Sequence, residues 1–119
     1  MTKKLKRLVT GFLAAAVVTA AVGVAVAQTD WHVVAPHSTN VHQIYGYAGI
    51  PISIEVEGDG STDLDLYAYD ENGRRIARDA DRTDYCLADW TPRWNGPFSI
   101  VVVNRGSDYN EYRFSIVYE

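Results

Sequence analysis

The chain is poor in cysteine, with Cys86 alone among its 119 residues. One cysteine excludes an internal disulfide, so a small domain of this sequence must be stabilised by its apolar core or by a bound metal ion. Cys86 shares one face of an apolar stretch with Ala88 and Trp90. We therefore expect Cys86 to be a buried hydrophobic residue rather than a reactive thiol.

Lysine is absent after the first seven residues, and basic residues are few beyond them. Of the 11 Lys and Arg residues, four lie in Met1–Arg7; the remaining 7 are arginines and face 15 acidic residues, a formal charge of −8. So acidic a domain argues against binding to nucleic acid or to an anionic membrane.

The N-terminal segment has the pattern of a secretory signal peptide. Its basic start is followed by Leu8–Ala27, which is apolar or small except for two threonines and ends in the small-x-small sequence Ala25-Val26-Ala27. We predict a signal peptide over residues 1–27, cleaved before Gln28, and a secreted or periplasmic mature protein. The apolar run is also long enough for an uncleaved anchor. No cysteine lies directly after it, which argues against a lipid anchor.

Residues 28–119 contain no stretch of helical period. They alternate instead in short apolar and polar steps between turn-forming residues, most clearly in Ile52–Glu57, where Ser53 and Glu55 would face water. Seven or eight such strands, with no repeat and no second domain, predict an all-β fold: one antiparallel β-sandwich over residues 28–119.

The stretch Gly58–Asp70 organises this domain. A loop of Gly, Asp and Ser leads into a strand whose leucines point to one side while Asp65 and Tyr67 point to the other. Asn72 and Gly73 follow, and this dipeptide reverses the chain readily because both residues tolerate a positive φ. We therefore predict a hairpin here.

The same region resembles the bacterial pre-peptidase C-terminal domain. The resemblance is carried by DLDLYAYDENG (63–73) and spans Val41 to Tyr118. The other motifs, in order, are Ala48-Gly49, the Ile52–Glu57 strand, Asp84, Trp90-Thr91-Pro92, Gly96-Pro97-Phe98, Val103-Asn104-x-Gly106 and Asn110-x-Tyr112. The resemblance implies a jelly-roll-like sandwich and a non-catalytic extracellular module, related to domains that bind calcium or polymeric substrates. We expect the module to stand alone behind the leader rather than to trail a protease.

Two groups of aspartates suggest a calcium site. Carboxylate oxygens from two loops suit Ca²⁺, and the predicted hairpin would bring the two groups to the same end of the sheet. The alternative is that they are ordinary loop residues or partners of nearby arginines, and for Asp65 we favour a structural hydrogen bond over metal ligation. No EF-hand pattern is present. The candidate ligands are Asp59, Asp63, Asp65, Asp79, Asp81 and Asp84.

Aromatic residues give a second candidate site, for stacking on sugar rings or contacting a peptide. Trp94, between Arg93 and Asn95 in a turn, is expected to be exposed and is the first candidate contact residue. Trp90 and Tyr109 join it as candidates, although for Trp90 we favour a structural role as a plug at one end of the sandwich.

Catalytic motifs are missing. His32, His37 and His42 are spaced by five residues on predicted strand and loop, which is not the helical pair of a zinc enzyme. We therefore predict no enzyme activity. The favoured function is an exported binding or accessory module whose partner, a protein or polysaccharide, lies outside the cytoplasm; the alternative is a structural or protein-interaction component of the cell envelope.

Overall fold

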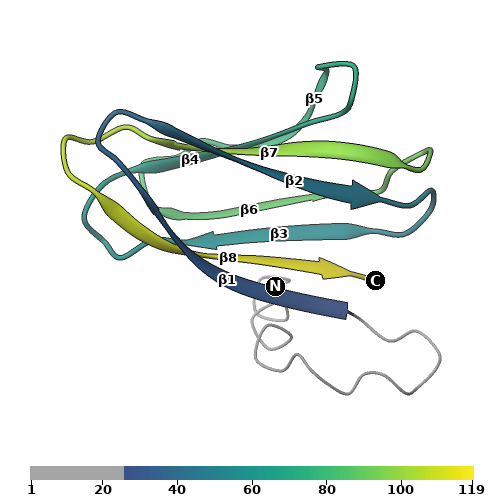
Figure 1. Cartoon of the computed structure of the whole chain (residues 1–119), viewed down its shortest axis with the longest axis horizontal. Coiled ribbons are helices and arrows are strands. Elements are labelled where there is room, and N and C mark those ends of the chain that lie inside the picture. Colours follow the sequence, from purple (N-terminus) through teal and green to yellow (C-terminus); the bar gives the residue numbers. More distant parts are fainter. Residues whose placement is uncertain (1–25) are drawn as a thin grey trace.

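The computed structural model describes residues 26–119, which form eight antiparallel strands in two facing sheets (Figure 1). One sheet has the strand order β1-β8-β3-β6 and the other β2-β7-β4-β5. No helix occurs in this part of the chain, so the predicted all-β antiparallel sandwich is confirmed. The strands are β1 (Val26–Val34), β2 (Thr39–Gly46), β3 (Ile52–Glu57), β4 (Leu64–Tyr69), β5 (Arg75–Asp79), β6 (Tyr85–Trp90), β7 (Gly96–Asn104) and β8 (Asn110–Tyr118).

The core lies between the inner faces of the two sheets and follows the alternation of the sequence. Leu64, Leu66 and Ala68 of β4 are fully buried, as predicted. Cys86 is buried too, with its thiol 3.2 Å from the carbonyl oxygen of Leu64, and burial raises the pKa of that thiol. The prediction of a buried cysteine is confirmed.

The outer face of β3 departs from the prediction. Ser53 and Glu55, expected to face water, are only 8% and 5% exposed. Both side chains have partners on β6: the Ser53 hydroxyl donates to Asp89 over 2.5 Å, and the Tyr85 hydroxyl donates to Glu55 over 2.6 Å. A polar residue in a central strand is thus buried where its neighbours satisfy its hydrogen bonds.

The hairpin predicted at Asn72 and Gly73 connects β4 to β5. Gly73 has a φ of +80°, in the left-handed region that glycine adopts at little cost. Asp70 holds the turn, because its carboxylate accepts hydrogen bonds of 2.9 Å from the backbone N–H groups of both Asn72 and Arg74.

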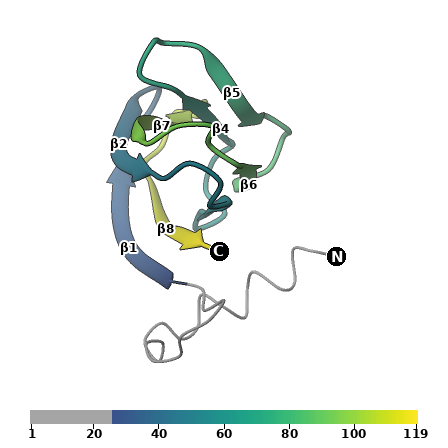
Figure 2. The same cartoon turned by 90° about the vertical axis from the view of Figure 1, so that its right-hand side faces the viewer.

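The first strand is one of the longest and lies at a sheet edge. β1 pairs with β8 over nine residues, from Val26 to Val34, and forms the edge of its sheet. The predicted signal peptide lies almost wholly outside the described residues. Within residues 26–119 the chain forms no helix that could cross a bilayer. Figure 2 shows β1 and β2 on one side of the sandwich and β5 and β6 on the other.

Because the strands alternate in direction, the loops gather at two ends. Loops 58–63, 80–84 and 105–109 lie at one end, which we call the acidic end; loops 47–51, 70–74 and 91–95 lie at the other, the tryptophan end. The two groups of aspartates therefore share one end, as predicted.

Candidate functional site

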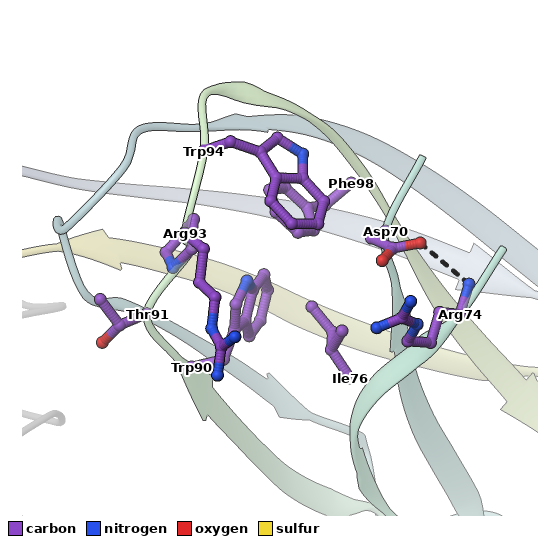
Figure 3. Close-up of a pocket in the computed structure, with 9 residues that line it drawn as sticks. Asp70, Arg74, Ile76, Trp90, Thr91, Arg93, Trp94 and Phe98 are labelled. Atoms are coloured by element: carbon purple, nitrogen blue, oxygen red, sulfur yellow. Dashed lines mark hydrogen bonds between the residues drawn. The ribbon is translucent and has the colours of Figure 1, made fainter. Parts of the chain in front are cut away.

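A surface depression of about 360 Å³ lies at the tryptophan end (Figure 3). β6 contributes Trp90, its last residue, and the following loop contributes Trp94. In Figure 3 Trp94 lies next to Phe98 on one side of the depression, while Trp90 and Ile76 lie on the other. The remaining lining residues are Asp70, Arg74, Thr91, Pro92 and Arg93. The structure thus brings together two of the three predicted aromatic contact residues.

Local hydrogen bonds hold the loop that carries Trp94. The Asn95 side chain accepts a hydrogen bond of 2.8 Å from the backbone N–H of Ala48, and the Gly49 N–H donates to the Pro92 carbonyl over 2.9 Å. These contacts join loops 47–51 and 91–95. Trp94 projects from an anchored backbone and is 40% exposed, as predicted.

Trp90 is held more firmly than Trp94. It is partly buried and packs against the core, and its ring centroid lies 5.5 Å from that of Phe98. Its indole nitrogen is buried and has no hydrogen-bond partner among the described residues. A buried N–H without an acceptor lowers the stability of a fold by about 1–3 kcal/mol, so such a group is uncommon in a protein interior.

The charges at the depression are predominantly positive. Asp70 is the only carboxylate that lines it, is 5% exposed, and is engaged by the β4–β5 turn. Arg74 and Arg93 are exposed, and no ion pair within residues 26–119 includes either of them. The depression therefore offers aromatic faces and hydrogen-bond donors, with no pair of free carboxylates for acid–base chemistry.

Tyr109 lies away from this depression. It belongs to loop 105–109 at the acidic end and is 60% exposed. The three predicted aromatic residues thus do not form one platform, and only the two tryptophans share a surface.

The aspartates proposed as calcium ligands form hydrogen bonds within the protein. Asp59 accepts hydrogen bonds from Ser61 and from the backbone N–H of Glu111, which lower its pKa. Asp84 accepts hydrogen bonds from Gly60 N–H over 2.6 Å and from Asn110 over 3.2 Å. Asp79 accepts from the Leu87 N–H and Asp81 from Thr83. These four side chains hold the loops of the acidic end together.

The acidic end also contains two carboxylates that are only partly satisfied. Asp65 pairs with Arg105 over 2.7 Å, which confirms the structural hydrogen bond predicted for it. One oxygen of Asp65 and one of Asp63 are nevertheless buried and lack a hydrogen-bond partner within residues 26–119. Burial, with the charges of Asp65 and Asp81, raises the pKa of Asp63. Among the described residues no three His, Cys, Asp or Glu side chains are arranged to hold a metal ion, so calcium binding stays a prediction.

Two of the three histidines, which do not have the spacing of a zinc pair, pack against each other in the fold. His32 of β1 and His42 of β2 lie edge to face, with ring centroids 4.5 Å apart, in a groove of about 500 Å³ between the two edge strands. His42 stacks on Phe114 at 4.1 Å and shares a hydrogen bond of 2.7 Å with the Tyr112 hydroxyl. Burial, and next the nearby His32, lowers the pKa of His42 to about 4. His32 lies two residues before the inward-facing Val34, and His42 lies two residues before the inward-facing Ile44. Because residues two apart in a strand share a face, this spacing could have placed both histidines on the inner faces of the sheets.

No family model matches the chain, and no curated protein matches it. Several solved structures share its fold. The pre-peptidase C-terminal domain of a collagenase from Bacillus anthracis aligns at a TM-score of 0.63 with 14% identity, over 75% of this chain and 87% of that one. PliG from Aeromonas hydrophila, a periplasmic inhibitor of g-type lysozyme, aligns at 0.63 with 12% identity, over 78% and 86%. The Yersinia pseudotuberculosis-derived mitogen aligns at 0.62 with 14% identity, over 76% and 83%. At these identities the similarity is one of fold: the chain has the sandwich of a pre-peptidase C-terminal domain.

Proposed function

We propose that the protein is an exported, non-catalytic binding module whose tryptophan depression takes a ring of a polymeric saccharide. The observation that carries this proposal is that Trp90 and Trp94 line the same depression. Indole faces present flat apolar area to the C–H face of a sugar, while donors at the rim meet its hydroxyl groups. The exposed side chains of Arg74 and Arg93 supply such donors.

Export and the absence of catalysis are supported separately. The predicted signal peptide argues for export, and PliG, which has this fold, is a periplasmic protein. Glycoside hydrolysis needs two carboxyl groups on either side of the bond that is cut, whereas the depression contains only Asp70, which the turn already engages.

Native gel electrophoresis through gels that contain soluble polysaccharides tests the proposal. We expect at least one of xylan, mixed-linkage β-glucan, polygalacturonate and alginate to retard the protein, and Trp94→Ala to abolish the retardation. Trp31→Ala is the matched control, because Trp31 is 63% exposed on β1, outside the depression. If no polysaccharide retards the protein, or if Trp94→Ala is retarded like the native chain, the proposal is wrong.

A second candidate is a protein-interaction role through β1, and one observation favours it. β1 is an edge strand, and Trp31 and Val33 are 63% and 55% exposed on it. Exposed edge strands can add a strand from another chain. Light scattering of the purified protein at rising concentration tests self-association. We expect the apparent molecular mass to rise with concentration for the native protein and to stay that of a monomer for Val33→Lys. A native protein that is monomeric at every concentration would exclude self-association through β1.

A further inference from the structure

The tryptophan depression has a charge opposite to that of the protein as a whole. Residues 28–119 have a formal charge of −8, yet two guanidinium groups line the depression. Figure 3 shows Arg93 and Arg74 on opposite sides of the space between the tryptophans and Ile76. In a domain with seven arginines and no lysine, two at one depression form a local cationic site.

Neither arginine is neutralised within the described residues. Asp70, the one lining carboxylate, accepts the backbone N–H of Arg74 rather than its guanidinium group. Glu71 is the next acidic residue in the turn, and its carboxylate lies against Gly96, where a Cβ atom would come within 2.6 Å of it. No ion pair joins Glu71 to either arginine. Other arginines of the chain do have partners: Arg105 pairs with Asp65, and Arg113 with Glu57.

We propose that Arg74 and Arg93 select saccharides whose rings carry a carboxylate, such as the uronic acids. This inference rests on the proposed function and adds the substrate class. A guanidinium group donates two parallel hydrogen bonds to a carboxylate, so it recognises that group better than a hydroxyl. The aromatic faces of Trp94 and Trp90 supply the contact for the ring, and the two arginines supply the contact for its charge.

The depression favours an acidic sugar over a neutral one for a further reason. Apart from the Thr91 hydroxyl, the polar side-chain groups of the depression that have no partner among the described residues and are exposed are two guanidinium groups, which are donors only. A neutral sugar presents hydroxyl groups, which need acceptors as well as donors. A carboxylate is an acceptor only and therefore matches this set of groups.

The experiment compares polygalacturonate with fully methyl-esterified polygalacturonate, which has the same rings without the charge. We expect the native protein to be retarded at least about fivefold more strongly by the acid form, with a preference that shrinks as salt is added. Arg74→Gln and Arg93→Gln should each weaken binding of the acid form about threefold to fivefold and leave the weak binding of the ester unchanged. Thermal melting of each variant checks that it is folded.

Arg75→Gln is the matched control. Arg75 neighbours Arg74 in the sequence, but its guanidinium group lies over the Tyr67 ring, 5.8 Å from the centroid, and does not line the depression. The substitution removes the same charge from the protein and should not change binding. If Arg75→Gln weakens binding as much as Arg74→Gln, the preference comes from the overall field and the inference is wrong.

The remaining outcomes separate the inference from the proposed function. Equal retardation by ester and acid, abolished by Trp94→Ala, would overturn the selectivity and leave saccharide binding intact. Retardation by neither form and by none of the other polysaccharides would overturn both. Dextran sulfate tests for a general polyanion site, and retardation by it that survives Trp94→Ala would also contradict the inference.

Discussion

Acid should weaken the fold through His42, and the effect can be worked out from its surroundings. The His42 ring lies in the groove between β1 and β2, stacked on Phe114 and hydrogen-bonded to the Tyr112 hydroxyl. Asn40 donates a hydrogen bond of 3.0 Å to the same hydroxyl, which leaves the tyrosine proton free to point at His42. That arrangement suits the neutral imidazole, and the nearby His32 further disfavours a charge there, whereas Asp30 opposes this effect.

The sign of the effect follows from the lowered pKa. In the unfolded chain His42 takes up a proton below about pH 6.5, whereas in the fold its pKa is about 4. The unfolded state therefore binds more protons between these values, and the free energy of unfolding falls as the pH falls from 6.5 to 4. A full shift of this size would be worth about 3 kcal/mol; because the ring is partly exposed to solvent, we expect about 1–2 kcal/mol.

Urea denaturation at pH 7.0, 5.5 and 4.0 measures this loss, with the native protein beside His42→Gln. The variant should be less stable at pH 7 but should lose about 1–2 kcal/mol less on acidification to pH 4. His37→Asn is the control, because His37 lies in an exposed loop with a φ of +49°, which asparagine tolerates, and its pH dependence should match that of the native chain. An identical slope in the native protein and His42→Gln would show that the buried imidazole does not couple to folding.

Three further outcomes are expected. Leu66→Ala should lower the free energy of unfolding by about 2–5 kcal/mol, because Leu66 is fully buried between the sheets; an unchanged melt would place it outside the core. Trp94→Ala should leave the melting temperature almost unchanged, because the side chain is 40% exposed and its loop is anchored by Asn95; loss of folding would make Trp94 a core residue. Millimolar Ca²⁺ should raise the melting temperature relative to a chelator if the acidic end binds the ion, and Asp63→Asn should remove the rise; no shift would leave the aspartates as loop-forming residues.

The strands could be predicted from the sequence because successive side chains of a strand point to opposite faces. Where one face is buried, apolar residues therefore recur at every second position. The alternation of β3 and β4 gives both strands directly, and the Asn-Gly turn after β4 gives its connection to β5. The pairing could not be predicted in the same way. For example, β1 pairs with β8, and Val34 lies opposite Asn110. The alternation of apolar and polar residues indicates which face of a strand is buried, but it does not indicate which distant strand is the hydrogen-bonding neighbour.

The candidate site was predictable in part for a related reason. Trp94 could be found from its turn and its neighbours, whereas Arg74 could not, because only the β4–β5 hairpin brings it towards loop 91–95. Tyr109 was grouped with the tryptophans by residue type. Strand direction could have separated it, since consecutive loops of antiparallel strands lie at opposite ends, and Tyr109 lies one loop after Trp94.

The acidic end and the tryptophan end both contain candidate residues, but their polar side chains differ in how many hydrogen bonds they make within the protein. At the acidic end the carboxylate of Asp84 accepts the Gly60 N–H and the Asn110 side chain and lies so close to Gly58 that a Cβ atom there would approach one of its oxygens to 2.2 Å. Such a carboxylate holds loops in place and has little capacity left for a ligand. At the tryptophan end the donors of Trp90 and the two arginines have no acceptor in the described part of the chain. Asp63 and Asp65 at the acidic end also each have a buried oxygen without a partner among the described residues. The tryptophan end differs in that its two exposed guanidinium groups, unpaired within residues 26–119, line a depression together with two indole rings, and this combination directs the search for a ligand there.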